Sequence, residues 1–178
     1  MSTYSSDPQP AALASADNHR MLRAQPLTPE AFAPYGDVIS YPVATGRAYF
    51  EQALGNLREH ATPSLSTTLR PPMAPSQRLS VELLERHEYS SQTFLPLGDV
   101  KWLIVVCPHH PDGGPDSERS VAFIANGRQG VTYRPDTWHH GLTVLEGTGQ
   151  FAVFMWRDGT QGDEEFVKIK PFDVILPT

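Results

Sequence analysis

The chain has 178 residues, about the length of one domain, and 39% of them are hydrophobic, which is enough to build a core and excludes wholesale disorder. A formal net charge of −6 argues against a general nucleic-acid binder, because such a protein needs a basic face. No run of apolar residues is long enough for a transmembrane helix. The single cysteine, Cys107, excludes an internal disulfide framework, and we expect a soluble, cytoplasmic protein with no membrane partner.

The first residues predict little structure. Residues 1–20 are rich in Ser, Ala, Pro, Asp and Gln without periodicity, which predicts a disordered tail, and residues 21–178 then form one domain. Leu27–Phe32 is predicted as a short helix, since Thr28 can cap it and a proline suits the first helical position. Residues 51–60 are a weak candidate for a second helix.

Short β-strands account for the rest of the chain. They mostly recur every 8–12 residues with turn residues between them, which is typical of a sandwich or barrel. Adjacent apolar residues in two of them indicate strands covered on both faces, by a second sheet or by a partner subunit. The predicted strands are Asp37–Tyr41, Ser64–Leu69, Leu79–Arg86, Thr93–Leu97, Lys101–Cys107, Ser120–Ala125, Gly130–Arg134, His139–Leu145, Phe151–Trp156, Phe166–Lys170 and Phe172–Leu176.

Two clusters carry the candidate chemistry. Glu85 and His87 are two residues apart, so a strand places both side chains on one face. Gln92 follows and can return to them across a hairpin. In the second cluster His139 and His140 are adjacent, so one faces inward and the other outward.

These clusters resemble the two sequence motifs of cupin barrels. Glu85 and His87 stand at the positions of the first motif's two histidines, with Gln92 at its acid, and the segment Gly130–His140 loosely matches the second motif. The resemblance implies an all-β, cupin-like (double-stranded β-helix, jelly-roll) barrel with one or two short helices. Glu85, His87 and His140 would be the ligands if a divalent metal is bound; otherwise Glu85 and His87 form a hydrogen-bonded pair in a metal-free pocket.

Three longer blocks resemble the ureidoglycolate lyase family: Leu27–Ile39, Leu84–Leu97 and Asn126–His140. A further segment of that family is matched only loosely, by Gly55–His60. The resemblance implies an enzyme of allantoin and purine catabolism that cleaves (S)-ureidoglycolate to glyoxylate and urea, and that is commonly a homodimer. It also implies a nickel requirement, as ascribed to some members.

This chemistry assigns roles to particular side chains. Cleavage of a carbinolamide needs a base for the hydroxyl proton and an acid for the departing nitrogen, and a histidine suits either task. His87 and His140 are the predicted catalytic pair, and Glu85 orients an imidazole. The predicted substrate-binding residues are Arg70 for the carboxylate, Gln92 for the ureido group, Arg134 and His139.

Two other functions remain open from the sequence. One is a metal-dependent cupin isomerase or oxygenase, and the other is a non-catalytic cupin that binds a small carboxylate. The acidic run Asp163–Glu165 is interpreted as a solvated turn.

Overall fold

Strands make up most of the part of the chain that the computed structural model describes, residues 20–177. The prediction for residues 1–20 concerns a segment of which only Arg20 is described. The elements are β1 (Met21–Arg23), β2 (Gln25–Pro26), α1 (Pro29–Phe32), β3 (Gly36–Ile39), β4 (Thr62–Leu69), β5 (Arg78–His87), β6 (Gln92–Pro96), β7 (Val100–Cys107), η1 (Ser117–Arg119), β8 (Val121–Ala125), β9 (Gly130–Tyr133), β10 (Trp138–His139), β11 (Thr143–Gly147), β12 (Gln150–Arg157) and β13 (Glu164–Ile175).

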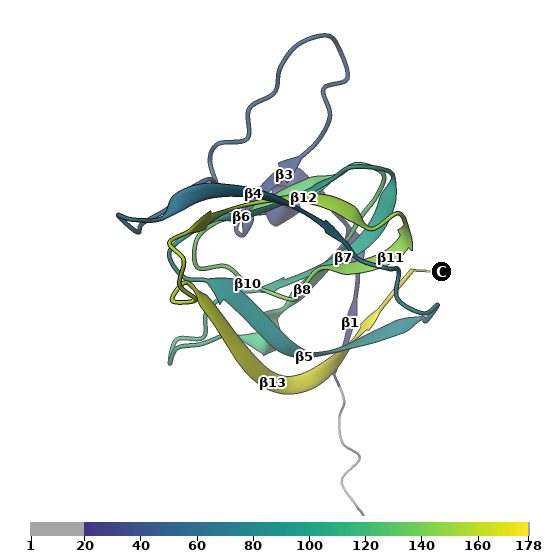
Figure 1. Cartoon of the computed structure of the whole chain (residues 1–178). Coiled ribbons are helices and arrows are strands. Elements are labelled where there is room, and N and C mark those ends of the chain that lie inside the picture. Colours follow the sequence, from purple (N-terminus) through teal and green to yellow (C-terminus); the bar gives the residue numbers. More distant parts are fainter. Residues whose placement is uncertain (1–19, 178) are drawn as a thin grey trace, which may run out of the picture.

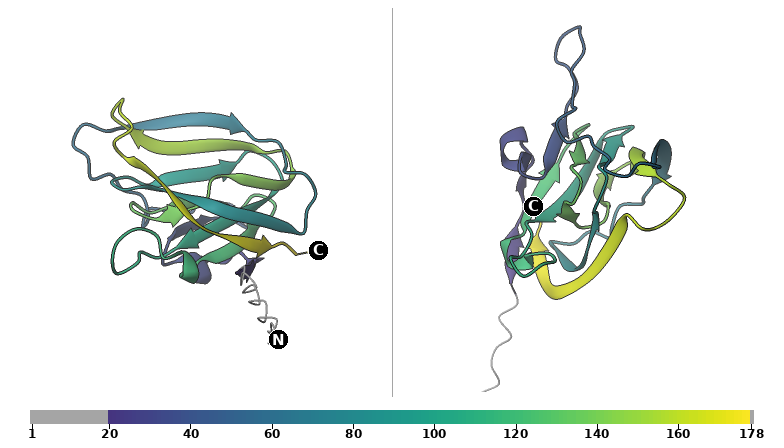
Figure 2. Two further views of the ribbon diagram at one scale, coloured as in Figure 1. Left: turned by 90° about the horizontal axis from the view of Figure 1, so that it is seen from below. Right: turned by 90° about the vertical axis from the view of Figure 1, so that its left-hand side faces the viewer.

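Two sheets face each other across a barrel (Figure 1). The larger runs in the order β1-β13-β5-β10-β7-β8-β2, with β11 also paired to β7, and the smaller in the order β3-β9-β6-β12-β4. The long strand β13 curves around one side of the barrel (Figures 1 and 2). This arrangement confirms the predicted all-β, cupin-like fold.

Strand β7 shows why the barrel has two layers of core. Its alternate residues Trp102, Ile104 and Val106 pack with the side chains inside the barrel. The residues between them, Leu103, Val105 and Cys107, pack into a second cluster under β13 and β5. Strand β8 is divided in the same way, so the adjacent apolar residues of Ser120–Ala125 do mark a strand covered on both faces, and the chain itself supplies both covers.

Helix α1 forms as predicted. The Thr28 hydroxyl accepts a hydrogen bond from the backbone N–H of Ala31, and Pro29 occupies the first helical position. Phe32 is completely buried against the inner core.

The predicted helix over residues 51–60 is wrong. Asn56 instead forms an isolated β-bridge with Ser90. Two backbone hydrogen bonds fix the extended segment there, from the N–H of Leu57 to the carbonyl of Tyr89 and from the N–H of Ser91 to the carbonyl of Gly55. Pairing with a neighbouring strand end has overridden a weak helical preference.

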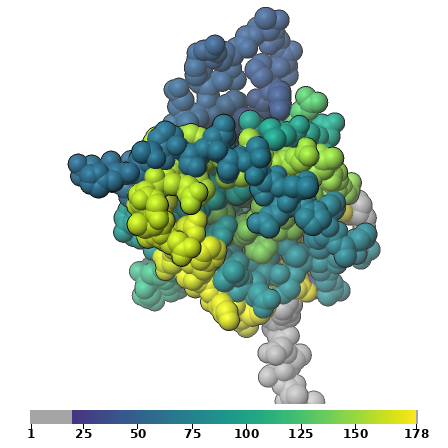
Figure 3. Space-filling model, viewed as in Figure 1, coloured from purple at the N-terminus to yellow at the C-terminus, as the bar shows by residue number. Residues whose placement is uncertain are grey.

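The loop of residues 40–50, which follows β3, projects away from the barrel (Figures 1 and 3). Its aromatic and aliphatic side chains are exposed: Tyr41 by 51%, Tyr49 by 67% and Val43 almost completely. Within residues 20–177 no helix has the length and hydrophobicity needed to cross a membrane.

Candidate functional site

Pairing between strands gathers four polar side chains on the inner face of the barrel. Glu85 and His87 alternate along β5 and therefore share a face. His139 on β10 lies directly opposite Glu85, and residues opposite each other in an antiparallel pair project to the same side. Gln92 begins β6 opposite Tyr133 of β9, on the facing sheet.

His139 is the centre of this cluster. Its side chain is 1% exposed, and its Nδ1 donates a hydrogen bond to the Thr137 carbonyl at 2.8 Å. Its Nε2 lies 3.3 Å from Oε1 of Glu85 and 3.2 Å from Oε1 of Gln92. The Tyr133 ring stacks on the imidazole at 4.1 Å between centroids. Nδ1 of His139 is thus hydrogen-bonded to the backbone, and Nε2 faces the Glu85 carboxylate and the Gln92 amide.

His87 stands beside it with a different environment. The two imidazoles are stacked 6.1 Å apart. His87 is buried, and its Nδ1 has no hydrogen-bond partner, although Oδ2 of Asp163 lies 3.5 Å away. Among the described residues none accepts from or donates to its Nε2. That nitrogen is therefore available to a ligand.

Burial and neighbouring charges shift the pKa values of Glu85 and His87. Burial would raise the pKa of Glu85, but the hydrogen bond and positive charge of His139 outweigh burial, and the pKa is lowered. Burial lowers the pKa of His87, and repulsion from His139 lowers it further. At neutral pH the site therefore holds an ionised carboxylate and a neutral His87 imidazole.

The predicted solvated turn at Asp163–Glu165 is wrong for Asp163. Its side chain is 6% exposed. It accepts hydrogen bonds from Ser90 Oγ at 2.5 Å and from the Tyr89 N–H at 2.8 Å, and Nη2 of Arg58 lies 3.2 Å away. Gly162 and the bends before it turn the chain so that this one acid of the run points inward.

The structure does not bring all predicted site residues together. His140, next in sequence, lies at the edge of the cluster, where its Nδ1 donates to the Leu83 carbonyl at 3.2 Å. Burial lowers the pKa of His140, while the negative charge of Glu85 opposes that shift. Of the two adjacent histidines, His139 is the one that faces inward.

The two predicted arginines lie elsewhere. Arg70 is exposed beyond the end of β4. Leu65 of β4 is level with Thr93, next to Gln92 of the cluster, because both residues pair with Phe154 of β12. Arg70 is five positions beyond Leu65, which corresponds to about 17 Å along an extended strand. Arg134 is exposed and donates to the Ala33 carbonyl at 2.8 Å. Neither guanidinium contacts Glu85, His87 or His139 in the part of the chain that is described.

A divalent metal does not fit the cluster as it stands. No group of three His, Cys, Asp or Glu side chains among the described residues is arranged to hold an ion. Nδ1 of His139 and Nδ1 of His140 each donate to a carbonyl, which leaves Nε2 as the nitrogen of either ring that could bind an ion. As the described side chains are arranged, Glu85, His87 and His140 are not gathered into a three-ligand centre.

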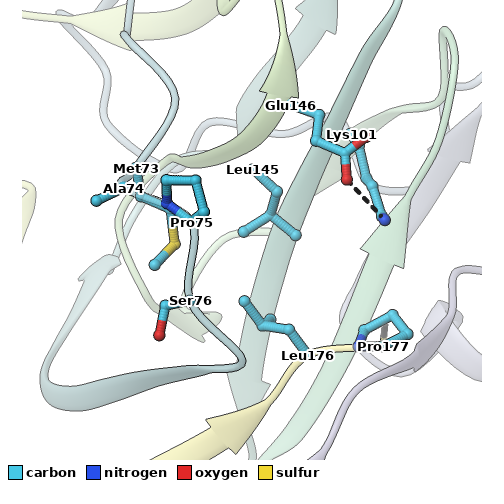
Figure 4. Close-up of a pocket in the computed structure, with 9 residues that line it drawn as sticks. All are labelled: Met73, Ala74, Pro75, Ser76, Lys101, Leu145, Glu146, Leu176 and Pro177. Atoms are coloured by element: carbon cyan, nitrogen blue, oxygen red, sulfur yellow. Dashed lines mark hydrogen bonds and ion pairs between the residues drawn. The ribbon is translucent and has the colours of Figure 1, made fainter.

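Glu85, His87, Gln92 and His139 line none of five surface cavities in the described part of the chain. One of about 270 Å³ is lined by Met73, Ala74, Pro75, Ser76, Lys101, Leu145, Glu146, Leu176 and Pro177, and the only charged pair drawn there, Lys101 with Glu146, bridges strands β7 and β11 (Figure 4). It contains no histidine and offers no acid–base pair.

Sequence reasoning missed three contributors to the site, namely Tyr133, Arg58 and Asp163. The loose family match at Gly55–His60 was a signal for Arg58. Tyr133 was visible inside the second cluster but carried no assignment. Asp163 had no local signal, because only the turn after β12 reveals its direction.

The fold and the inner-face cluster together define a cupin-like barrel with ionisable side chains gathered on its inner face. Comparison with known proteins gives the narrower class. The model of the family described as ureidoglycolate lyase matches residues 19–174. The chain belongs to the ureidoglycolate lyase family.

Individual relatives agree over most of their length. A protein of Agrobacterium fabrum is 42% identical over 144 residues, covering 81% of this chain and 88% of its own. The ureidoglycolate lyase of Pseudomonas savastanoi pv. phaseolicola is 38% identical, covering 75% of this chain and 82% of its own. That of Schizosaccharomyces pombe is 30% identical, covering 82% and 89%.

Proposed function

We propose that this protein is a lyase that cleaves ureidoglycolate to glyoxylate and urea. Family membership supports the substrate and the reaction. The observation that carries the mechanism is the convergence of Glu85, His87 and His139 on one inner face of the barrel. That convergence supplies a base and an acid within one small space.

The reaction needs one proton removed and one delivered. The substrate carbon bears a hydroxyl, a hydrogen, a carboxylate and the ureido nitrogen. As the hydroxyl proton leaves, the C=O bond of glyoxylate forms and the C–N bond breaks. Its electron pair goes to the nitrogen, which takes a proton and leaves as urea.

In this proposal His87 is the base. Its pKa is lowered by burial and by His139, so the imidazole is neutral and can accept the hydroxyl proton at Nε2. His139 is the acid. Its Nδ1 donates to the Thr137 carbonyl, and its Nε2 lies 3.3 Å from Oε1 of Glu85 on the side that faces the site.

Binding of the substrate draws on nearby polar groups. The Gln92 amide faces the same space as His139 and is suited to the ureido group. His140, at the edge, is the alternative proton-transfer residue that the sequence predicted. For the carboxylate, register favours Lys168 over Arg70 and Arg134, because Lys168 lies opposite Leu83, on the face that Glu85 shares.

Nickel stays a prediction of the family resemblance. A divalent ion would acidify the substrate hydroxyl and polarise its oxygen. Since the described donors do not fit a three-ligand centre, every step above uses only the chain's own side chains.

The test is incubation of the purified protein with ureidoglycolate and simultaneous assay of glyoxylate and urea. Equal amounts of both support the proposal. Release of ammonia and CO2 in place of urea would make it a hydrolase, and binding without turnover would favour the carboxylate-binding alternative. Oxygen uptake with stoichiometric iron would favour the oxygenase.

We also propose a cytoplasmic homodimer. The one cysteine of the chain, Cys107, is buried in the second core, where burial raises the pKa of its thiol to about 12 and makes it unreactive. A chain with one cysteine forms no internal disulfide, which supports a reducing compartment. The exposed Tyr41, Val43 and Tyr49 offer apolar contact area to a second copy. Light scattering of the purified protein tests this, and a monomer at micromolar concentration would contradict it.

A further inference from the structure

Asp163 is a buried carboxylate at the end of the barrel that holds His87. The chain places it in the turn just before β13, and its backbone is fixed there by the Glu88 N–H, which donates to the Asp163 carbonyl at 2.9 Å. Strand β5, which carries His87, pairs with β13 so that His87 lies opposite Glu164. Asp163 is therefore adjacent to His87 by register as well as by contact.

Three donors hold and orient this carboxylate. Ser90 Oγ and Nη2 of Arg58 both approach Oδ2, and the Tyr89 N–H binds Oδ1. Arg58 is itself anchored, since its Nη1 lies 2.8 Å from Asp158 and its Nη2 donates to the Trp156 carbonyl at 2.9 Å. A buried charge is costly unless it is paired and hydrogen-bonded, and here it is both.

One buried nitrogen beside this carboxylate lacks a hydrogen bond. Nδ1 of His87 has no partner within hydrogen-bonding geometry, and Oδ2 of Asp163 lies 3.5 Å from it. A neutral imidazole can carry its proton on either nitrogen. With the proton on Nε2, the Nδ1 lone pair would face a carboxylate oxygen and be repelled. With the proton on Nδ1, the N–H lies beside that oxygen and the two groups attract each other.

We propose that Asp163 is a positioning residue that fixes His87 in its Nδ1–H tautomer and so leaves the Nε2 lone pair free to act as the base. Asp163 does not touch the reacting atoms and acts through His87. The catalytic part of this inference rests on the proposed function, whereas the tautomer does not. The role differs from that of Glu85, which faces the other imidazole.

The first test needs only the wild-type protein. Long-range 1H–15N spectra of a 15N-histidine sample at pH 8, without substrate, report which nitrogen of each neutral imidazole bears the proton. A His87→Gln sample assigns the His87 signals among the seven histidines. We expect His87 to be Nδ1-protonated. An Nε2-protonated His87 would overturn the inference without any variant.

The second test is Asp163→Asn. Its amide oxygen can still accept from the Tyr89 N–H, while its NH2 group, at the position of Oδ2, can donate to Nδ1 of His87 and would hold the ring in the wrong tautomer. We expect the His87 signals to move to the Nε2–H pattern, and kcat to fall by about 100-fold or more with KM changed by less than about threefold. A general loss of structure would instead move every histidine signal.

Glu165→Gln is the matched control. Glu165 belongs to the same acidic run but pairs with Arg86 on the opposite face of β5. It should leave the His87 tautomer unchanged and kcat within about threefold. Folded Asp163→Asn protein with an Nδ1-protonated His87 and wild-type kcat would overturn the inference. If the wild type has the expected tautomer but releases no glyoxylate, the proposed function fails and the tautomer assignment stands.

Discussion

Charged side chains lie on both faces of strand β5, but their surroundings differ. On the outer face Arg86 lies 4.7 Å above the Trp138 ring and is paired with Asp136 and Glu165, whose side chains are 46% exposed. On the inner face Glu85 and His87 meet His139, which is 1% exposed. Water screens the outer charges, whereas burial shifts the pKa values of the inner ones. The environment of these side chains, more than their residue type, distinguishes stabilising ion pairs from a site suited to proton transfer.

The His139→Asn variant gives the largest expected difference between the two faces of β5. It removes the inner imidazole that joins Glu85 and Gln92, and we expect kcat for glyoxylate release to fall by about 100-fold or more. Circular dichroism checks that the barrel remains folded. His140→Asn is the matched control at the adjacent residue, with an expected loss of about tenfold or less. The reverse order of effects would restore His140 as the sequence-predicted catalytic residue.

On the outer face Arg86→Met should affect stability rather than chemistry. It removes the stacking over Trp138 and three partly exposed ion pairs, with Glu88, Asp136 and Glu165, for which we expect a loss of about 1–2 kcal/mol in the free energy of unfolding. Urea denaturation measures it, and kcat should stay within about threefold. A large fall in kcat with unchanged stability would mean that the outer network acts on the site directly.

Acid should weaken the fold through the inner face. The pKa values of His87 and His140 are lowered from 6.5 in the folded protein, so the unfolded chain takes up protons first as the pH falls through that value. Stability therefore declines below about pH 6.5 and continues to decline until the folded-state pKa values are passed. Urea midpoints between pH 8 and 5 measure the slope, and a His87→Gln, His140→Gln variant should flatten it. A midpoint that rises on acidification would contradict the assignment.

Metal removal should have the smallest effect. Because the described donors do not form a three-ligand site, protein dialysed against a chelator should keep its activity within about twofold. Elemental analysis accompanies the assay. Loss of activity that nickel alone restores would show that His87 or His140 rearranges to bind it.

The barrel was predictable from the sequence because its signals are local. Alternating apolar residues and turn residues located most strands, and Thr28 with Pro29 located the helix. Some boundaries depend on partners far along the chain. The predicted strand His139–Leu145 divides into β10 and β11, and two predicted C-terminal strands are one strand whose register shifts between Lys168 and Phe172.

The site was predictable only in part, for a physical reason. Spacing by two placed Glu85 and His87 on one face, but it could not decide between His139 and His140, because that choice depends on which residue pairs with Glu85. Arg58 and Asp163 meet across 105 positions of sequence, in a contact that no periodicity encodes. Arg70 was assigned from its strand and lies several residues too far along it.

The short strand β1 has a consequence for how the molecule is made. It precedes the other described strands of the larger sheet along the chain, yet Met21 pairs with Asp173, and β2 pairs with β8. The larger sheet therefore cannot be completed until β13 has been synthesised, about 150 residues after β1, and such distant pairing slows folding. Truncation within the final strand should leave nascent chains with an unpaired edge and a tendency to aggregate.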